Sequence, residues 1–345
     1  MPVIGALCST SDPKQGNILR SEKQGAFSAH HWSISVGYRY QHSFRHFVGT
    51  TEQTQRETQH TQVVNYINLF DAALTYSVNP RWSMTVSMSI MNATRTYDHQ
   101  LFQTLLHIPN APDQVSHSNG IGDIEVSAQF WVLRPPSERG HNIAFSFGTV
   151  FPTGSYDVRD TVQTVNGPQR VFVDQSIQLG AGGYGITLGT EAYQRINRFV
   201  LYGSGTYLLT PQEQNSTPNA SLAGVNFPPN PLTAHMSIPD QYLADGGVSY
   251  PVPKIRGLAA KFGMRYEGVK VRDFIGGSLG FRRPGYALSV EPGAQYERGR
   301  TTWSVNIPVA VQRNRKRSVP DLIQGRAGDA AFADYLILVG YSRSF

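Results

Sequence analysis

Long stretches of this sequence alternate apolar and polar residues with a period of two. In the segment 82–90, serine or threonine separates every apolar side chain from the next without a break. The same alternation recurs at 32–40, 124–132, 258–267 and 303–312. Because successive side chains of a β-strand point to opposite faces, these segments are expected to form strands with one apolar and one polar face.

The complete pattern predicts about 12 strands, most of them nine residues or longer. Their expected ranges are 32–41, 63–78, 81–91, 121–133, 142–151, 175–190, 198–209, 240–251, 257–267, 285–297, 302–313 and 332–345. The glycine-rich strand at 175–190 does not define which of its faces is apolar. Soluble sheets usually have strands of about five or six residues, whereas a tilted strand needs about nine to eleven to cross a bilayer. Strand length therefore favours a transmembrane sheet.

The connections between these strands alternate strictly between short and long. The short ones are 79–80, 134–141, 194–197, 251–256 and 298–301, and the long ones are roughly 42–62, 92–120, 152–174, 210–239, 268–284 and 314–331. Bacterial outer-membrane barrels have short periplasmic turns and long external loops. The sequence therefore predicts an all-β fold, a transmembrane up-and-down antiparallel β-barrel over 31–345 in the bacterial outer membrane, with both termini in the periplasm.

Composition excludes several other classes of protein. Only 16% of the 345 residues are charged, against about 25% in typical soluble domains, and 11% are aromatic, which argues against disorder. No run of 18 apolar residues predicts a helical membrane span. The single cysteine, Cys8, excludes a disulfide framework. The net charge of +6 is scattered along the chain, so a nucleic-acid partner is not expected.

Aromatic residues cluster near the ends of the apolar faces, as in the girdles of membrane barrels. They are Tyr38, Tyr40, Tyr76, Trp82, Tyr250, Tyr266, Tyr286, Tyr296, Trp303, Tyr335 and Tyr341. Ordinary core aromatics of a soluble sandwich are the alternative.

The C-terminal segment 335–345 resembles the signal read by the outer-membrane barrel-assembly machinery, which makes that machinery an expected partner. Apolar residues occupy alternate positions up to Tyr341, and the chain ends in Phe345. Arg343 departs from this pattern and is expected to reach the membrane interface.

The basic run 313–317 is expected at the cell surface, where lipopolysaccharide phosphates favour cations, although a solvated charge run explains it equally well. Membrane lipid and lipopolysaccharide are therefore expected partners, and the barrel is expected to be a monomer.

Residues 1–30 have no strong periodicity. Val3–Cys8 is apolar but has no basic residue before it, so it is a poor match to a complete secretory signal. We interpret 1–30 as the remnant of a signal peptide followed by a periplasmic tail or a plug; a cytosolic protein is the alternative.

Two segments resemble a known family. The strand opening Gly120–Glu125 and the segment Phe145–Gly154 are similar to outer-membrane barrel proteins of the MetA-pathway of phenol degradation family, which are described mostly as transporters. Gln129 and Phe130 depart from the family's basic and tyrosine positions. The resemblance implies a barrel channel and tilts the solute towards aromatic or hydrophobic compounds.

Three motifs weakly suggest enzymes or metal sites. Gly180–Gly185 fits a dinucleotide-binding pattern, but the residues that follow are strand-like rather than helical. His117 and Ser118 suggest a phospholipase, yet adjacent residues on a strand point to opposite faces. Rim positions explain His30, His31, His42 and His46 better than a metal cluster does. No catalytic residue, cofactor or metal is therefore expected.

The polar strand faces carry the functional prediction, because charges facing lipid at mid-membrane cost a few kcal/mol each. The residues expected to line the lumen are Arg39, Asp71, Asp123, Glu125, Gln129, Lys261, Arg265, Glu267, Glu291, Asn306 and Asp334. A barrel of this size encloses a narrow passage. We expect a channel for passive uptake or export of small solutes, aromatic or hydrophobic compounds among them. A closed structural or adhesive barrel, or a lipid-modifying enzyme, are the alternatives.

Overall fold

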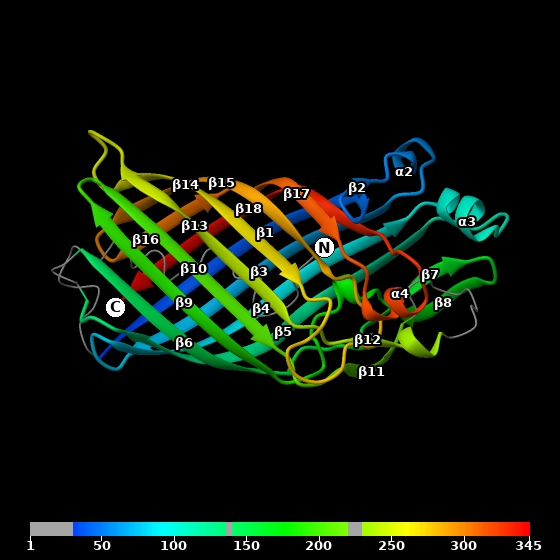
Figure 1. Cartoon of the computed structure of the whole chain (residues 1–345), viewed down its shortest axis with the longest axis horizontal. Coiled ribbons are helices and arrows are strands. Elements are labelled where there is room, and N and C mark those ends of the chain that lie inside the picture. The colour runs from blue at the N-terminus through cyan, green and yellow to red at the C-terminus, as the bar shows by residue number, and fades with distance from the viewer. Residues whose placement is uncertain (1–29, 136–139, 220–229) are drawn as a thin grey trace.

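The computed structural model describes residues 30–135, 140–219 and 230–345. Within these ranges, twelve strands form one closed antiparallel barrel (Figure 1). They are β1 (His31–Val48), β3 (Val63–Ser77), β4 (Trp82–Tyr97), β5 (Gln114–Trp131), β6 (His141–Phe151), β9 (Gly185–Ile196), β10 (Phe199–Leu209), β13 (Gln241–Pro251), β14 (Leu258–Val269), β15 (Gly285–Arg298), the interrupted strand formed by β16 (Thr301–Asn306) and β17 (Val309–Arg315), and β18 (Ala330–Ser344). Successive strands pair along the chain, and β18 closes the barrel against β1. The predicted barrel is confirmed.

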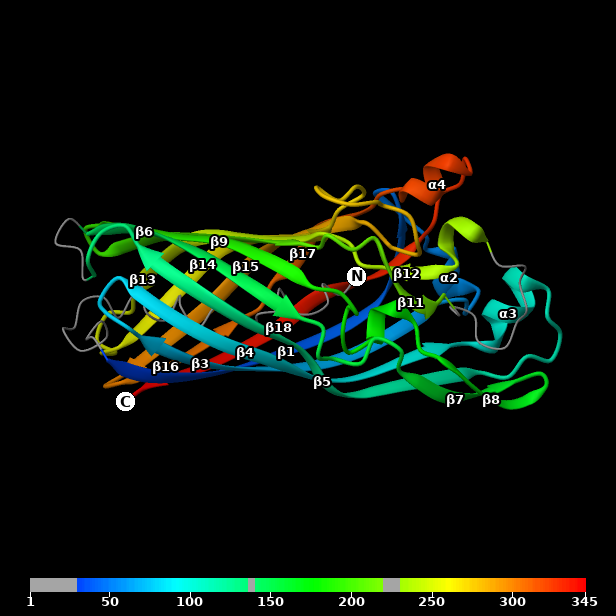
Figure 2. The ribbon, with the colours of Figure 1, turned by 90° about the horizontal axis from the view of Figure 1, so that it is seen from below.

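All long connections lie at one end of the barrel, and the short turns and the C-terminus lie at the other (Figures 1 and 2). The loop end carries β2 (Thr51–Glu52), α2 (Gln55–Thr58), α3 (His99–Leu106), β7 (Arg159–Thr164), β8 (Gly167–Phe172), the 3-10 helix η2 (Gln175–Ile177), β11 (Gln214–Pro218), the 3-10 helix η3 (Pro231–Thr233), β12 (His235–Ser237) and α4 (Val319–Ile323). Strands β1, β4 and β5 extend further towards this end than predicted, so the loops there are shorter. Residues 1–29 of the predicted N-terminal segment lie outside the described ranges.

In the described part of the chain, no helix is long and apolar enough to span a membrane.

The outer face of the barrel is apolar and carries two aromatic belts. At the short-turn end, Trp32 packs on Tyr76 with ring centroids 4.8 Å apart, and Trp303 packs on Tyr341 at 4.5 Å. At the loop end, Tyr266 lies 5.2 Å from Tyr242 and 5.1 Å from Tyr286.

The spacing of the belts fits a bilayer. Tyr66 near the loop end and Tyr76 near the turn end point outward from β3, ten residues apart. Ten residues span about 33 Å of strand, which a tilt of about 40° reduces to about 25 Å, the height of the apolar band in outer-membrane barrels.

The last residue of the chain is hydrogen-bonded to the first barrel strand, since the Phe345 amide donates to the carbonyl oxygen of Trp32 at 2.9 Å.

The expected strand at 175–190 is wrong in position. Residues 175–177 form η2, and the strand β9 begins only at Gly185 and runs to Ile196. The turn to β10 is correspondingly shorter than predicted. The glycines before Gly185 therefore belong to the loop that precedes β9.

The strand expected at 302–313 is interrupted at Ile307-Pro308, where proline has no amide hydrogen for the ladder. Beyond it, a β-bulge at Val311 leaves Val311 and Gln312 both exposed and reverses the alternation. Arg313 and Arg315 therefore point into the barrel and are buried. The run 313–317 was expected to be a cluster of surface cations; it lies at the loop end, but only Lys316 and Arg317 of its cations are exposed there.

Candidate functional site

The inner face of the barrel is polar and tightly packed. Of the predicted lumen residues, Arg39, Asp123, Gln129, Lys261, Arg265, Glu267, Glu291 and Asn306 are buried, whereas Asp71, Glu125 and Asp334 are half-buried. On β14 the buried Lys261 and Arg265 alternate with the exposed Phe262 and Met264. A side chain as enclosed as Arg39, which is 2% exposed, does not border a wide water-filled pore. Side chains therefore fill the middle of the barrel in this state.

An ion cluster crosses the lumen at this level. Arg39 on β1 donates to both carboxylate oxygens of Glu267 on β14, from Nη2 at 2.8 Å and from Nη1 at 3.3 Å. Arg265 Nε donates to Glu267 Oε2 at 2.7 Å. On the shorter way round the wall, β18, the β16–β17 strand and β15 lie between β1 and β14, so the contact joins well-separated parts of the wall. This cluster of Arg39, Arg265 and Glu267 is called the ion layer below.

The other predicted lumen residues make contacts elsewhere on the inner face of the barrel. Gln129 donates to Glu191 at 2.9 Å, and Glu125 accepts from Thr187 at 2.6 Å, which links β5 to β9 across β6. The Lys261 ammonium lies 4.6 Å from the centre of the Tyr202 ring. Nearer the loop end, Asp334 accepts from Arg45 and Arg313. Asp71, Glu291 and Asn306 complete the inner face on β3, β15 and β16.

The connection between β6 and β9, residues 152–184, folds back into the barrel. After the β7–β8 hairpin, Val173, Ile177 and Leu179 are buried against inward side chains of the wall. Their partners on the strands are Ile67, Leu69, Met91, Ala93, Val150 and Leu208. We call residues 173–184 the infolded segment. It narrows the lumen from the loop end.

Asp123 and three glycines fix the infolded segment to the wall. Asp123 accepts hydrogen bonds from the amides of Gly154 and Ala181, both at 2.9 Å. A Cβ on Gly154 would lie 2.8 Å from the carbonyl carbon of Gly122, and one on Gly180 would collide with the carbonyl oxygen of Gly154. The glycine motifs at 120–123 and 180–185 therefore permit close backbone contact. Ser118 points inward and donates to Ile177, while the adjacent His117 is exposed on the other face.

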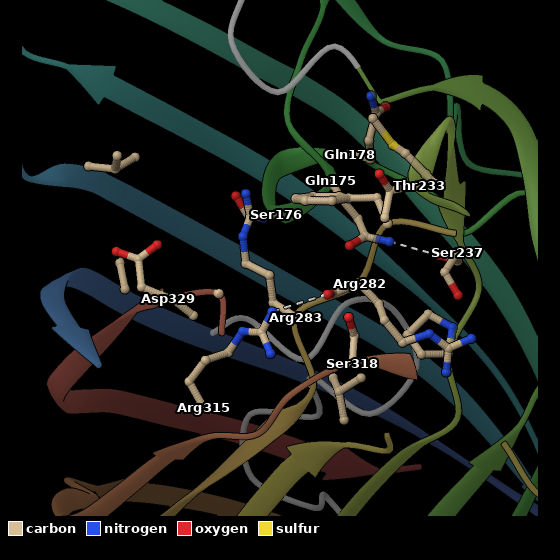
Figure 3. A pocket seen from close by; sticks show the side chains of 18 of the residues that line it. Gln175, Ser176, Gln178, Thr233, Ser237, Arg282, Arg283, Arg315, Ser318 and Asp329 are labelled. Atoms are coloured by element: carbon tan, nitrogen blue, oxygen red, sulfur yellow. Dashed lines mark hydrogen bonds between the residues drawn. The ribbon is translucent and has the colours of Figure 1, made fainter. Parts of the chain in front are cut away.

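A cavity of about 370 Å³ opens at the loop end (Figure 3). Elements far apart in sequence supply its lining: Gln175 and Ser176 from η2, Ser237 from β12, Arg283 from the 270–284 connection and Arg315 from β17. Gln175 donates to the carbonyl oxygen of Ser237 at 2.8 Å. Its apolar wall consists of Val63, Tyr97, Leu101, Met236, Ile238, Val269 and Phe281. This space is called the outer cavity.

The polar wall of the outer cavity is rich in arginine. Arg283 donates to both oxygens of Asp174 at 2.7–2.8 Å, and Arg95 lies 3.6 Å from the same carboxylate. Burial alone would raise the pKa of Asp174, but the charges of Arg283 and Arg95 outweigh it and hold that pKa far below its usual range. Asp174 therefore stays ionised and fixes both guanidinium groups in place.

A second cavity, of about 640 Å³, lies at the short-turn end. Four cationic residues line it, Arg195, Arg198, Lys254 and Arg256, together with the acidic Glu297. Strand β14 runs from this inner cavity to the outer one, because Ala259 lines the former and Val269 the latter. The ion layer lies between them. On β14 the buried Lys261 also lies between the two cavities, so packed side chains, the ion layer among them, separate the two.

The histidines do not form a metal site. His31 and His46 lie 15 residues apart on β1, about 50 Å of strand. In the described ranges, one other group has the composition of a metal site, Asp98, His99 and Asp113 near α3. The hydrogen bond that His99 Nδ1 donates to Asp113 raises the pKa of His99, so an exposed ion pair accounts for that group.

No family model and no curated protein matches the sequence. The structure is similar to the crystal structure of the COG4313 outer membrane channel from Pseudomonas putida F1, at 10% identity and a TM-score of 0.59, with 94% of this chain and 99% of that chain covered. The translocator domain of autotransporter NalP from Neisseria meningitidis also matches, at 10% identity and a TM-score of 0.45, with 99% and 100% covered. So does the P. putida toluene transporter TodX, at 9% identity and 0.42, with 95% and 92% covered.

This chain is a bacterial outer-membrane β-barrel. The fold, the two aromatic belts and the apolar band between them agree on that location.

The sequence did not predict the arginine-rich wall of the outer cavity. Arg95, Arg283 and Asp174 lie on three separate elements, and the period-two pattern does not show which loop enters the lumen. One signal was available, the Arg282-Arg283-Pro284 run, because its loop, 270–284, has four cations and one acidic residue, so the cations need counter-ions from elsewhere. The inward turn of Arg315 followed from the bulge at Val311, which a regular alternation does not reveal.

Proposed function

We propose that this barrel is a passive channel for small amphipathic or hydrophobic solutes. One observation carries the proposal: a cavity opens at each end of the lumen, and the side chains between the two include the ion-paired Arg39, Arg265 and Glu267. Ion pairs between side chains can rearrange without moving the wall. A solute therefore needs to displace side chains, but not strands, to pass from one cavity to the other.

The apolar wall of the outer cavity suits an aromatic or aliphatic solute, and its arginines suit a polar group on that solute. The similar P. putida F1 structure is described as an outer membrane channel, which agrees with the proposal. The resemblance to the phenol-degradation family remains part of this proposal, as do assembly through Tyr341 and Phe345 and contact of the surface loops with lipopolysaccharide. The proposal includes no enzymatic activity, because His117 and Ser118 point to opposite faces.

Ion selectivity in planar bilayers tests whether the lumen conducts. Lys261 lies on the inner face between the two cavities, whereas Lys270 is exposed just beyond the same strand. Since charges that line a pore set its selectivity, Lys261→Glu is expected to shift the reversal potential in a salt gradient towards cation preference. The matched Lys270→Glu is expected to leave it unchanged. Absence of conductance in all three proteins, or equal selectivity, would contradict the channel and favour a closed structural barrel.

A further inference from the structure

The outer cavity combines an apolar wall with an excess of positive charge. Its lining includes six arginines, Arg56, Arg95, Arg282, Arg283, Arg315 and Arg326, and two aspartates, Asp321 and Asp329. Two more carboxylates, Asp174 and Asp273, pair with these arginines from behind. Six arginines therefore face four carboxylates, which leaves two positive charges in excess around an enclosed space.

Two of the arginines have unused hydrogen-bond donors. Among the described residues, neither Nε of Arg282 nor Nε of Arg315 has a hydrogen-bond partner. Both residues line the cavity and are buried, at 2% and 4% exposure. Arg315 Nη2 lies 3.5 Å from the carbonyl oxygen of Arg282, so the two arginines are neighbours. A buried guanidinium donor without a partner carries a free-energy cost, which a nearby negative charge would offset.

We propose that the outer cavity binds an amphipathic carboxylate, that is, a small aromatic or aliphatic acid in its ionised form. The carboxylate accepts from guanidinium groups of the cavity wall, Arg315 among them, and the apolar body packs against Tyr97, Met236 and Phe281. This inference rests on the proposed channel and names the class of its solute. Arginine suits a carboxylate because its planar donors match the two carboxylate oxygens.

The size and the far end of the lumen agree with this solute class. A volume of about 370 Å³ lies within the usual range for small-molecule sites, about 300–1,000 Å³. An inorganic anion would leave the apolar wall without a partner. At the other end, four cationic residues and one glutamate line the inner cavity, so an anion that leaves the outer cavity meets positive charge again.

Calorimetric titration of the full chain in detergent tests the proposal without any variant. Sodium benzoate is expected to bind at least about tenfold more tightly than benzyl alcohol, which has a similar ring and no charge, since hydrogen bonds to charged groups exceed neutral ones. Benzoate is also expected to bind more tightly than inorganic phosphate. Equal binding of benzoate and benzyl alcohol would overturn the proposal, and tighter binding of phosphate would show a plain anion site instead.

Two variants then locate the site. Arg315→Gln is expected to weaken benzoate binding by about 10- to 100-fold and to leave benzyl alcohol unchanged, because it removes one charged donor from the cavity. Lys316→Gln removes the same charge from the exposed neighbouring residue, which does not line the cavity, and should change benzoate binding less than twofold. Equal effects of the two variants would place the anion elsewhere. If benzoate does not bind but the barrel still conducts ions, this inference fails and the channel stands; if benzoate binds and nothing conducts, the channel fails.

Discussion

Replacing Glu267 with glutamine is expected to open the middle of the barrel to ions. In the native protein this carboxylate accepts from Arg39 and Arg265, and all three side chains are buried. Glutamine has nearly the same shape without the charge. The variant therefore leaves two buried guanidinium groups close together without their common counter-ion.

The size of the effect follows from the burial of this layer. Removing one partner of a buried ion pair costs about 3–5 kcal/mol, because the remaining charge is left uncompensated. That cost falls on the closed arrangement, since an open, hydrated lumen would solvate both arginines. At about 1.4 kcal/mol for each factor of ten, the ratio of open to closed molecules should rise by roughly two to three and a half orders of magnitude.

Single-channel recording in planar bilayers measures this change directly. Glu267→Gln should show a larger or more frequent conducting state than the native barrel. Two controls accompany it. Glu52→Gln breaks a half-exposed ion pair with Arg45 at the loop end and should leave conductance unchanged. Arg39→Met/Arg265→Met/Glu267→Leu fills the same space without charge and should remain closed, since a buried ion triad is replaceable by apolar residues of similar volume. Equal conductance of Glu267→Gln and the native barrel would refute the reasoning.

Three further predictions follow from the loops and the ends of the barrel. Gly180→Val should release the infolded segment, because the valine side chain would collide with Gly154. The variant should still assemble as a heat-modifiable barrel, but proteases should now cleave it within 173–184. Unchanged cleavage would contradict the close contact between Gly180 and Gly154. Burial alone would raise the pKa of Asp329, yet the hydrogen bond from His46 and the charge of Arg56 lower it to about 2, below its usual 3.8. Asp329 therefore anchors loop 316–329 above about pH 4, and this anchoring is lost as the pH falls towards 2. Pepsin cleavage near the exposed Leu322, normalised to an unstructured substrate, should rise over that range. In Asp329→Asn, cleavage should already be faster than in the native protein at pH 4. Deleting Phe345 should sharply reduce assembled barrel in cells, and normal assembly of the shortened chain would show that the terminal residue is not read.

The strands were predictable because lipid contact affects every second residue. In β4 the alternation from Trp82 to Ile90 is unbroken, and its apolar members are exposed on the outer face. The inward set on β14 was predictable for the same reason. Two local features were not predictable from the alternation. The bulge at Val311 turns the side chains of Arg313 and Arg315 into the barrel. The glycines before β9 were assigned to a strand, but they belong to a loop whose backbone lies close to the wall.

The partners inside the lumen were not predictable from one sequence. Arg39 and Glu267 are 228 positions apart, and Asp174 and Arg283 are 109 apart. Alternation shows that a side chain points inward, but not which residue of another strand it meets. It also does not show which of several long loops folds into the barrel. Both depend on the tilt and register of the closed sheet, and these are properties of the whole wall.

Solute flux through the purified barrel tests the central claim most directly. The measurement is the initial rate of uptake of radiolabelled benzoate into vesicles that contain the full chain. Ala259→Trp puts a large side chain into the inner cavity, whereas Ala260→Trp puts the same side chain on the exposed outer face of the same strand. The account predicts uptake faster than in protein-free vesicles for the native barrel and for Ala260→Trp, and a return to the protein-free rate for Ala259→Trp. Uptake at the protein-free rate in the native barrel, or equal uptake in both variants, would contradict a solute path through the lumen.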